Sequence, residues 1–117
     1  MKKILLWLCL MAVPANASSG FMDVNNACAI NTSNWLVSHG IHVKRTWSSH
    51  DFVHYRRVSR SEARLGDVAH TWRDGGGHVA PVLKRAGGVV ICMNPSHHHH
   101  AWVEKVCPAN ATFHRIN

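Results

Sequence analysis

The spacing of apolar residues changes along the chain, from a helical period to a strand-like one. Between residues 25 and 39 apolar side chains recur at an approximately helical spacing. Asn25 or Asn26 can cap the start of this segment, and Gly40 stands where a helix often ends. We therefore predict one helix here, with Cys28 in its first turn.

Four later segments are short, rich in β-branched residues and separated by turn residues, which is typical of strands. They are residues 68–73, 78–83, 89–93 and 101–107. The intervening residues 41–64 are polar and basic, and they predict a loop with a short helix around residues 49–55. The expected fold class is α+β, with the N-terminal helix packed on a small antiparallel β-meander.

The first residues have the pattern of a secretory signal peptide. Lys2 and Lys3 precede an apolar run over residues 4–13, and a small-residue cleavage site follows and ends at Ala17. An uncleaved membrane anchor is the alternative, but about 10 apolar residues are fewer than the roughly 20 that a spanning helix needs. We predict a signal peptide over 1–17, a single domain over 18–117, and a secreted or periplasmic protein that is not an integral membrane protein.

The charge balance favours anionic partners. The chain has 13 Lys and Arg against 6 Asp and Glu, a formal net charge of +7, and loss of Lys2 and Lys3 lowers it by two. Outside the cytoplasm such a charge favours peptidoglycan or another anionic cell-wall polymer. Because no RNA-binding aromatic motif accompanies the basic residues, we do not expect nucleic acid as a partner. An ordinary solvated basic face is the alternative.

Three cysteines remain once Cys9 leaves with the signal peptide. In an oxidising compartment two of them are expected to pair. Cys92 and Cys107 lie on neighbouring predicted strands and could face each other across a hairpin, which would leave Cys28 free. Pairing of Cys28 with either of the others stays open, and it would remove Cys28 as a nucleophile.

Cys28 and His78 are the residues that could carry chemistry. A thiol activated by an imidazole base is the basis of cysteine hydrolysis. The first turn of a helix has unpaired backbone N–H groups and the positive end of the helix dipole, which stabilise a thiolate. His78 opens a predicted strand in Gly77-His78-Val79-Ala80.

Several short segments together resemble NlpC-type cell-wall cysteine peptidases, and the order also resembles the related CHAP amidases. The matching pieces, in chain order, are Cys28, Trp35-Leu36, Gly40 to Thr46, Val58 to Glu62, Gly66-Asp67-Val68 and Gly77-His78-Val79-Ala80. The chain departs from the family pattern at Ala27 and Ala29, where Asp and Ser are usual. It also departs at Leu65, which replaces a proline.

The resemblance implies a papain-like fold and a cysteine peptidase or amidase that cleaves amide bonds in peptidoglycan without a cofactor. Cys28 would attack the carbonyl carbon and His78 would move the proton. We choose Asn94 as the third residue because it lies on the next strand and its amide oxygen can orient the imidazole. Strand alternation puts Cys92 and Asn94 on one face, so the disulfide and this role conflict unless the strand is irregular.

Two readings without catalysis are also open. The four consecutive histidines 97–100 could bind a metal, although alternate side chains in a strand diverge and no regular zinc spacing is present. The chain could instead be a non-catalytic secreted wall-binding or inhibitor module. Four tryptophans could then form a sugar-stacking surface, namely Trp35, Trp47, Trp72 and Trp102.

Overall fold

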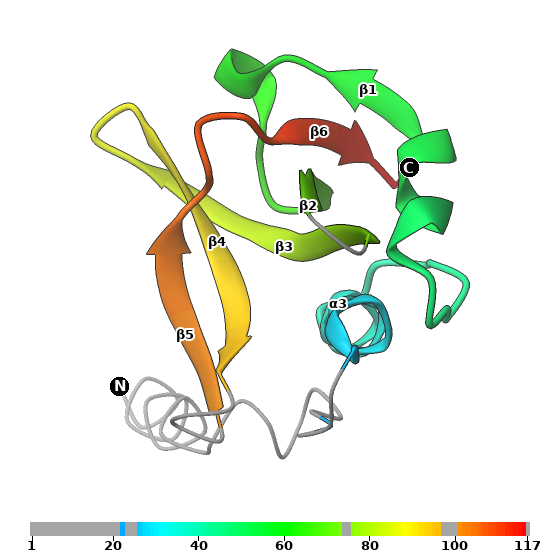
Figure 1. The fold of residues 1–117 in the computed structure, drawn as a ribbon. Coiled ribbons are helices and arrows are strands. Elements are labelled where there is room, and N and C mark those ends of the chain that lie inside the picture. Colours follow the sequence, from blue (N-terminus) through cyan, green and yellow to red (C-terminus); the bar gives the residue numbers. More distant parts are fainter. Residues whose placement is uncertain (1–21, 23–25, 74–75, 97–100, 117) are drawn as a thin grey trace, which may run out of the picture.

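The computed structural model describes residues 22, 26–73, 76–96 and 101–116. These residues form one α-helix, two short 3₁₀ helices and one six-stranded antiparallel sheet (Figure 1). The predicted signal peptide and the four histidines 97–100 lie outside the described residues. Among the residues described, no helix is both long enough and apolar enough to span a membrane.

The helix, α3 (Cys28–Ser38), begins at Cys28 and confirms the predicted helix with slightly tighter ends. It buries Ala29, Trp35 and Leu36, and it ends where Gly40 takes a positive φ of 80° that favours glycine. Thr32 also faces inward, and its hydroxyl donates a hydrogen bond of 3.3 Å to the carbonyl of Val79. That contact fixes α3 against the strand that carries His78.

The sheet has the strand order β1-β6-β2-β3-β4-β5, and each neighbouring pair is antiparallel. Its strands are β1 (Arg56–Val58), β2 (Asp67–Arg73), β3 (Gly76–Ala86), β4 (Val89–Ser96), β5 (Ala101–Val106) and β6 (Thr112–Arg115). The four predicted strands correspond to β2, β3, β4 and β5. These strands follow one another as hairpins.

The predicted papain-like α+β arrangement is wrong. The described chain is mostly antiparallel sheet with a single helix, because β1 and β6 extend the sheet beyond the four predicted strands. Neither added strand has a clear sequence signal. Arg56 and Arg57 of β1 are exposed at the edge of the sheet, so the segment has the composition of a polar loop. β6 is only four residues long.

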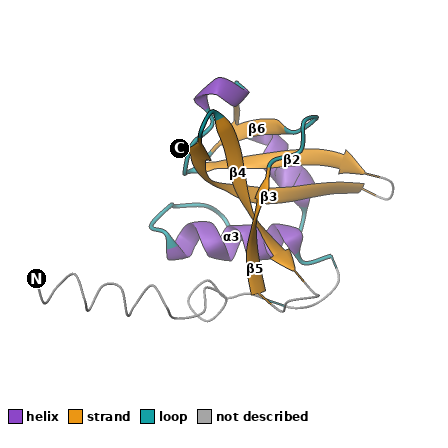
Figure 2. Ribbon diagram, turned by 90° about the vertical axis from the view of Figure 1, so that its left-hand side faces the viewer, coloured by secondary structure: helices purple, strands orange, loops and turns teal. Residues whose placement is uncertain are grey.

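The two faces of the sheet carry different cores. The helix-side face includes Val68, Val79 and Trp102, which pack with the buried side chains of α3. The disulfide-side face includes Ala80 and Cys92, which pack with neighbouring strands and with no residue of α3. Figure 2 shows α3 lying along one side of the sheet. Since alternate residues of a strand point to opposite faces, these clusters assign a face to each strand residue.

The 3₁₀ helices cover the sheet near β1. The first, η1 (Ser49–His54), matches the predicted short helix and buries Phe52 in the helix-side core. The second, η2 (Arg60–Glu62), follows β1 directly. η1 lies beside the β2 and β3 strands, so its side chains border the region around His78.

Candidate functional site

The cysteine prediction is confirmed. Cys92 and Cys107 form a disulfide with a Cα–Cα distance of 5.4 Å, and Cys28 is free. The two cysteines are separated by 15 positions in the sequence. Closing a loop of this length lowers the entropy of the unfolded chain, which stabilises the fold by about 3 kcal/mol. The alternative pairings of Cys28 are therefore not adopted, and its thiol is available for chemistry.

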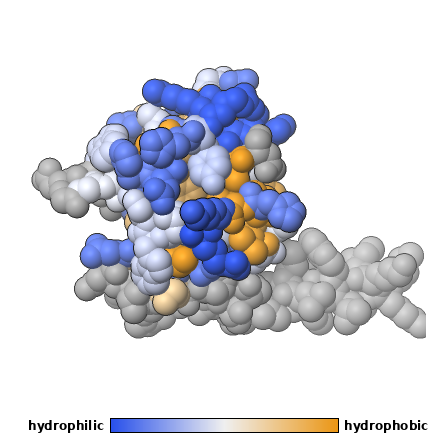
Figure 3. Space-filling view, turned by 90° about the vertical axis from the view of Figure 1, so that its right-hand side faces the viewer, coloured by the Kyte–Doolittle hydropathy of each residue, from blue (hydrophilic) through white to orange (hydrophobic). Residues whose placement is uncertain are grey.

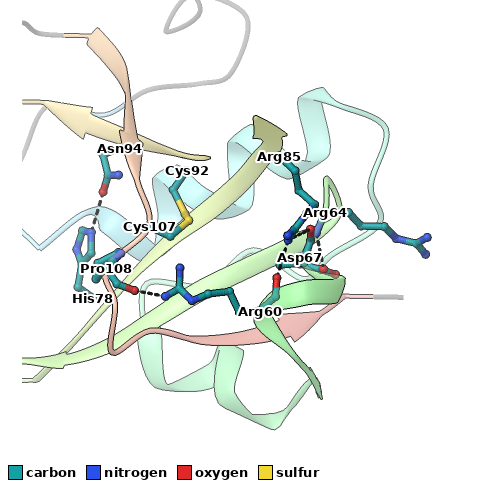
Figure 4. The surroundings of a disulfide bond; sticks show 10 residues. Arg60, Arg64, Asp67, His78, Arg85, Cys92, Asn94, Cys107 and Pro108 are labelled. Atoms are coloured by element: carbon teal, nitrogen blue, oxygen red, sulfur yellow. Dashed lines mark hydrogen bonds between the residues drawn. A yellow bond between two sulfur atoms is a disulfide. The ribbon is translucent and has the colours of Figure 1, made fainter. Parts of the chain in front are cut away.

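His78 and Asn94 are joined directly. Nε2 of His78 lies 3.0 Å from Oδ1 of Asn94, and the two side chains point at each other in Figure 4. Because an amide oxygen only accepts, Nε2 must carry the proton and donate it. In the neutral ring this tautomer makes Nδ1 the acceptor nitrogen. The pair is thus set up for a base that receives a proton at Nδ1.

The disulfide and the His78–Asn94 hydrogen bond coexist without the expected conflict. Cys92 and Asn94 do share the disulfide-side face, as alternation predicts. Cys92 bonds to Cys107, while Asn94, two residues further along β4, reaches His78. The irregularity in this part of the sheet lies between Val82 and Lys84 of the partner strand β3.

Cys28 lies at the same end of the molecule as the start of β3. In Figure 2 the first residues of α3 and the β2–β3 hairpin point the same way. The thiol is half-buried and packs on the helix-side core, which holds Val79 and Met93. Val79 directly follows His78 in β3, and Met93 directly precedes Asn94 in β4. The structure thus brings His78 and Asn94 together on the disulfide-side face, whereas Cys28 packs against the core of the helix-side face.

Within the described residues, no side chain caps the start of α3. The N-cap residue is Ala27, which makes no side-chain capping bond, and the first turn has no acidic residue. The first backbone N–H groups of a helix lack partners within the helix. These groups can donate hydrogen bonds to an oxyanion that forms beside the first turn.

His70 is a buried histidine that the sequence did not predict to be part of the site. His70 of β2 is 1 % exposed, and within the described part of the chain neither ring nitrogen has a hydrogen-bond partner. Burial lowers the pKa of His70, and the positive charges of His114, His50 and His78 lower it further. The only signal in the sequence was a polar residue inside a strand pattern, which does not reveal that the ring lacks a partner.

Glycine at position 77 is required by the packing around His70. A Cβ on Gly77 would lie 2.5 Å from Nε2 of His70 and 2.9 Å from Oγ of Ser49. Both atoms are far closer than ordinary contacts allow. His70, Ser49 and Gly77 therefore form one tight contact directly before His78, on the helix-side face.

The described residues also form a hollow between the segment after α3 and η1. The hollow, of about 310 Å³, is lined by Lys44, Thr46, Asp51, His54 and Tyr55, and the Thr46 hydroxyl donates to Asp51 within it. Over the described ranges, no group of three or more His, Cys, Asp or Glu side chains could hold a metal ion. The histidine tract on which the metal hypothesis rested is outside those ranges.

No family model, curated protein or solved structure matches the chain. The candidate site consists of Cys28, His78, Asn94 and the residues that surround them.

Proposed function

We propose that the protein is an exported cysteine hydrolase that cleaves amide bonds in peptidoglycan peptides. The observation that carries the proposal is the hydrogen bond between His78 and Asn94, at the end of the molecule where the one free thiol of the described chain begins a helix. A nucleophile, a base and a residue that orients the base are the three parts that this chemistry needs.

In the proposed mechanism Cys28 Sγ transfers its proton to Nδ1 of His78 and attacks the amide carbonyl carbon. Asn94 accepts from Nε2 and holds the ring in the tautomer that can take this proton. The backbone N–H groups at the start of α3 stabilise the oxyanion. His78 then protonates the leaving amine, and water hydrolyses the thioester by the reverse proton path.

The proposal adds one movement to the geometry, an approach of Sγ to Nδ1 around the start of β3. Gly76 has open space where a side chain would lie, whereas Gly77, which directly precedes His78, is packed against His70 and Ser49. Catalytic contacts are often longer in the free enzyme and tighten when substrate binds. A test of the proposal must therefore show that Cys28 and His78 act on each other.

The surface charge and the disulfide support an exported protein that acts on an anionic polymer. Figure 3 shows hydrophilic side chains gathered at the top of this face of the molecule. Arg56 and Arg57 of β1 and Arg64 after η2 are exposed. Such a surface attracts the carboxylates and phosphates of a cell wall. The Cys92–Cys107 disulfide fits an oxidising compartment.

Digestion of purified peptidoglycan by residues 18–117 tests the reaction. We expect new amino groups and new muropeptides, abolished by Cys28→Ala and reduced about 10²–10⁴-fold by His78→Ala. Asn94→Ala should reduce the rate at least about tenfold because the tautomer is no longer fixed. His42→Ala, which changes an exposed histidine after α3, is the matched control and should leave the rate unchanged.

The coupling between the two residues has its own measurement. In the parent, the rate of iodoacetamide labelling of Cys28 should follow a pH profile that His78→Ala shifts and His42→Ala does not. If both variants label as the parent does, or if digestion survives Cys28→Ala and His78→Ala, the protein does not use this mechanism. A non-catalytic wall-binding module would then be the better description.

A further inference from the structure

Trp72 is a large aromatic side chain that the fold holds at the surface. Its side chain is 62 % exposed although β2 is an interior strand of the sheet. Trp72 pairs with Gly77 across the β2–β3 hairpin, so it lies beside the residue that precedes His78. Isolated exposed tryptophans need no explanation, but this ring is flanked on two sides by histidines.

Two imidazoles fix the orientation of the indole. The ring of His70 meets it edge-on, with centroids 4.8 Å apart and an interplanar angle of 76°. The ring of His50 lies 5.5 Å away at 53°, and His54 follows at 5.5 Å from His50. These distances are within the range of favourable aromatic pairs. The four rings thus form a row from β2 to η1, which we call the aromatic row.

The aromatic row is buried at its inner end and exposed at its outer end. His70 is buried and held by Gly77 and Ser49, whereas His50 and His54 are exposed. A ring that is already ordered loses little conformational entropy when a ligand binds. An exposed indole between polar rings therefore has the properties of a preorganised binding surface.

We propose that Trp72, with His50 and His54, binds a sugar ring of the glycan strands in the cell wall. The apolar face of a pyranose can lie on the indole, and the imidazole nitrogens can hydrogen-bond to its hydroxyl and acetamido groups. A sugar residue is flat and carries polar groups around its rim. The aromatic row offers the same arrangement, with an apolar face and polar groups at the side.

Two observations favour a sugar over a peptide or a phosphate polymer. An extended peptide can bind by adding to a free sheet edge, but β3 pairs with β2 from Val68 to Arg73 and β6 pairs with it from Asp67 to His70, which leaves only the last residues of β2 with one open edge. A phosphate polymer would require a dense positive charge. The exposed arginines are spread over β1, the segment after η2, Arg45 and Arg85, whereas the row itself holds an indole and imidazoles.

The bound glycan would belong to the substrate of the proposed hydrolase. That identification rests on the proposed function, whereas binding of the sugar to Trp72 does not. Trp72 is paired with the neighbour of His78, so a sugar on its ring lies at the end of the molecule where the stem peptide would be cut. Glycan binding itself does not require catalysis, and the two can be measured separately.

The test uses residues 18–117 carrying Cys28→Ala, titrated with chitotetraose by calorimetry and followed by the indole N–H signals in NMR spectra. Saturable binding is expected, weakened at least tenfold by Trp72→Ala and by a smaller factor by His50→Ala. Trp47→Ala is the matched control, because Trp47 is similarly exposed at 56 % and lies outside the aromatic row. It should bind as the parent does. Trp72→Leu, which retains apolar bulk without the ring, provides a second variant if Trp72→Ala fails to fold.

Equal affinities for the Trp72 and Trp47 variants, or no binding of chitotetraose, overturn the inference. Trp72-dependent binding of a stem pentapeptide without binding of chitotetraose overturns it as well, and assigns the row to peptide. Failure of the proposed function looks different. In that case peptidoglycan is not cleaved by the unmutated protein, while chitotetraose still binds in a Trp72-dependent way.

Discussion

The two faces of the sheet each carry a histidine, and the two imidazole rings differ in burial and in hydrogen bonding. On the disulfide-side face His78 is half-buried and bonded to Asn94, next to the Cys92–Cys107 bridge. On the helix-side face, one strand away, His70 is buried more deeply and has no hydrogen-bond partner within the described residues. A paired imidazole can be aimed for proton transfer, whereas an unpaired one mainly adds a cost to folding.

The disulfide-side face also carries a buried ion pair, although the Thr71 hydroxyl on that face has no hydrogen-bond partner within the described residues. Asp67 shares the disulfide-side face with Ala69, and its buried carboxylate is bonded by Arg115 and by the backbone N–H of Arg64. The hydrogen bond from Arg115 to Asp67 also raises the pKa of Arg115. The buried charges of this face are therefore satisfied, and we expect it to be sensitive to the loss of any partner.

Removal of the Asp67 charge should have the largest effect on stability. Asp67→Asn leaves the Arg115 guanidinium partly buried without its counter-ion, which costs about 3 kcal/mol. The matched control is Glu104→Gln, which removes the exposed pair with Lys84 at 3.6 Å and should cost less than about 1 kcal/mol. Urea unfolding of both variants at pH 7 measures the difference. Equal losses would show that the buried pair contributes no more than the surface pair.

A side chain at position 77 should have the next largest effect, on the helix-side face. Gly77→Ala places a Cβ 2.5 Å from His70 Nε2, and overpacking of this kind costs about 1–3 kcal/mol. The loss should shrink when His70→Ala is also present, because the ring that obstructs the Cβ is gone. Unfolding free energies of the two single variants and the double variant give the coupling. Additive losses would mean that His70 is not what excludes the side chain.

The features of the fold and of the candidate site that depend on local sequence patterns were predicted from the sequence. The helix around Cys28, four strands and the Cys92–Cys107 pairing follow from periodicity, β-branched residues and cysteine parity. Asn94 was chosen because it lies on the strand that follows His78, and the two side chains are hydrogen-bonded at 3.0 Å. These features are local because each is decided by residues close together in the chain or by one hairpin.

The parts that failed depend on contacts between distant segments. β1 pairs with β6 across more than 50 residues, for example Arg56 with Arg115, and neither strand has apolar alternation strong enough to be recognised. The face on which α3 packs, and with it the side from which Cys28 approaches the sheet, is likewise a tertiary property. The isolation of His70 depends on Ser49 and Gly77, which approach it only in the folded chain.

Protonation of His70 should have the smallest effect on the free energy of unfolding. It affects the helix-side face only, because His70 lies on that face. Burial lowers the pKa of His70 in the folded chain, with contributions from His114, His50 and His78, whereas the unfolded chain keeps the usual value near 6.5. The unfolded state then binds a proton more readily. The contribution of neutral His70 to the stability of the folded chain is therefore complete above pH 6.5. It declines as the pH falls from 6.5 through the pKa of His70 in the folded chain.

His70→Asn removes this titration, so its unfolding free energy should decline less between pH 7.5 and pH 5.5 than that of the parent. His42→Asn changes an exposed histidine outside the aromatic row, and it should keep the parental decline. Ser49, Trp72 and Gly77 also border the ring but carry no group that titrates in this range. An unchanged pH dependence in His70→Asn would mean that the folded chain protonates His70 as easily as the unfolded chain does. In that case the contrast between the two histidines would lie in hydrogen bonding alone.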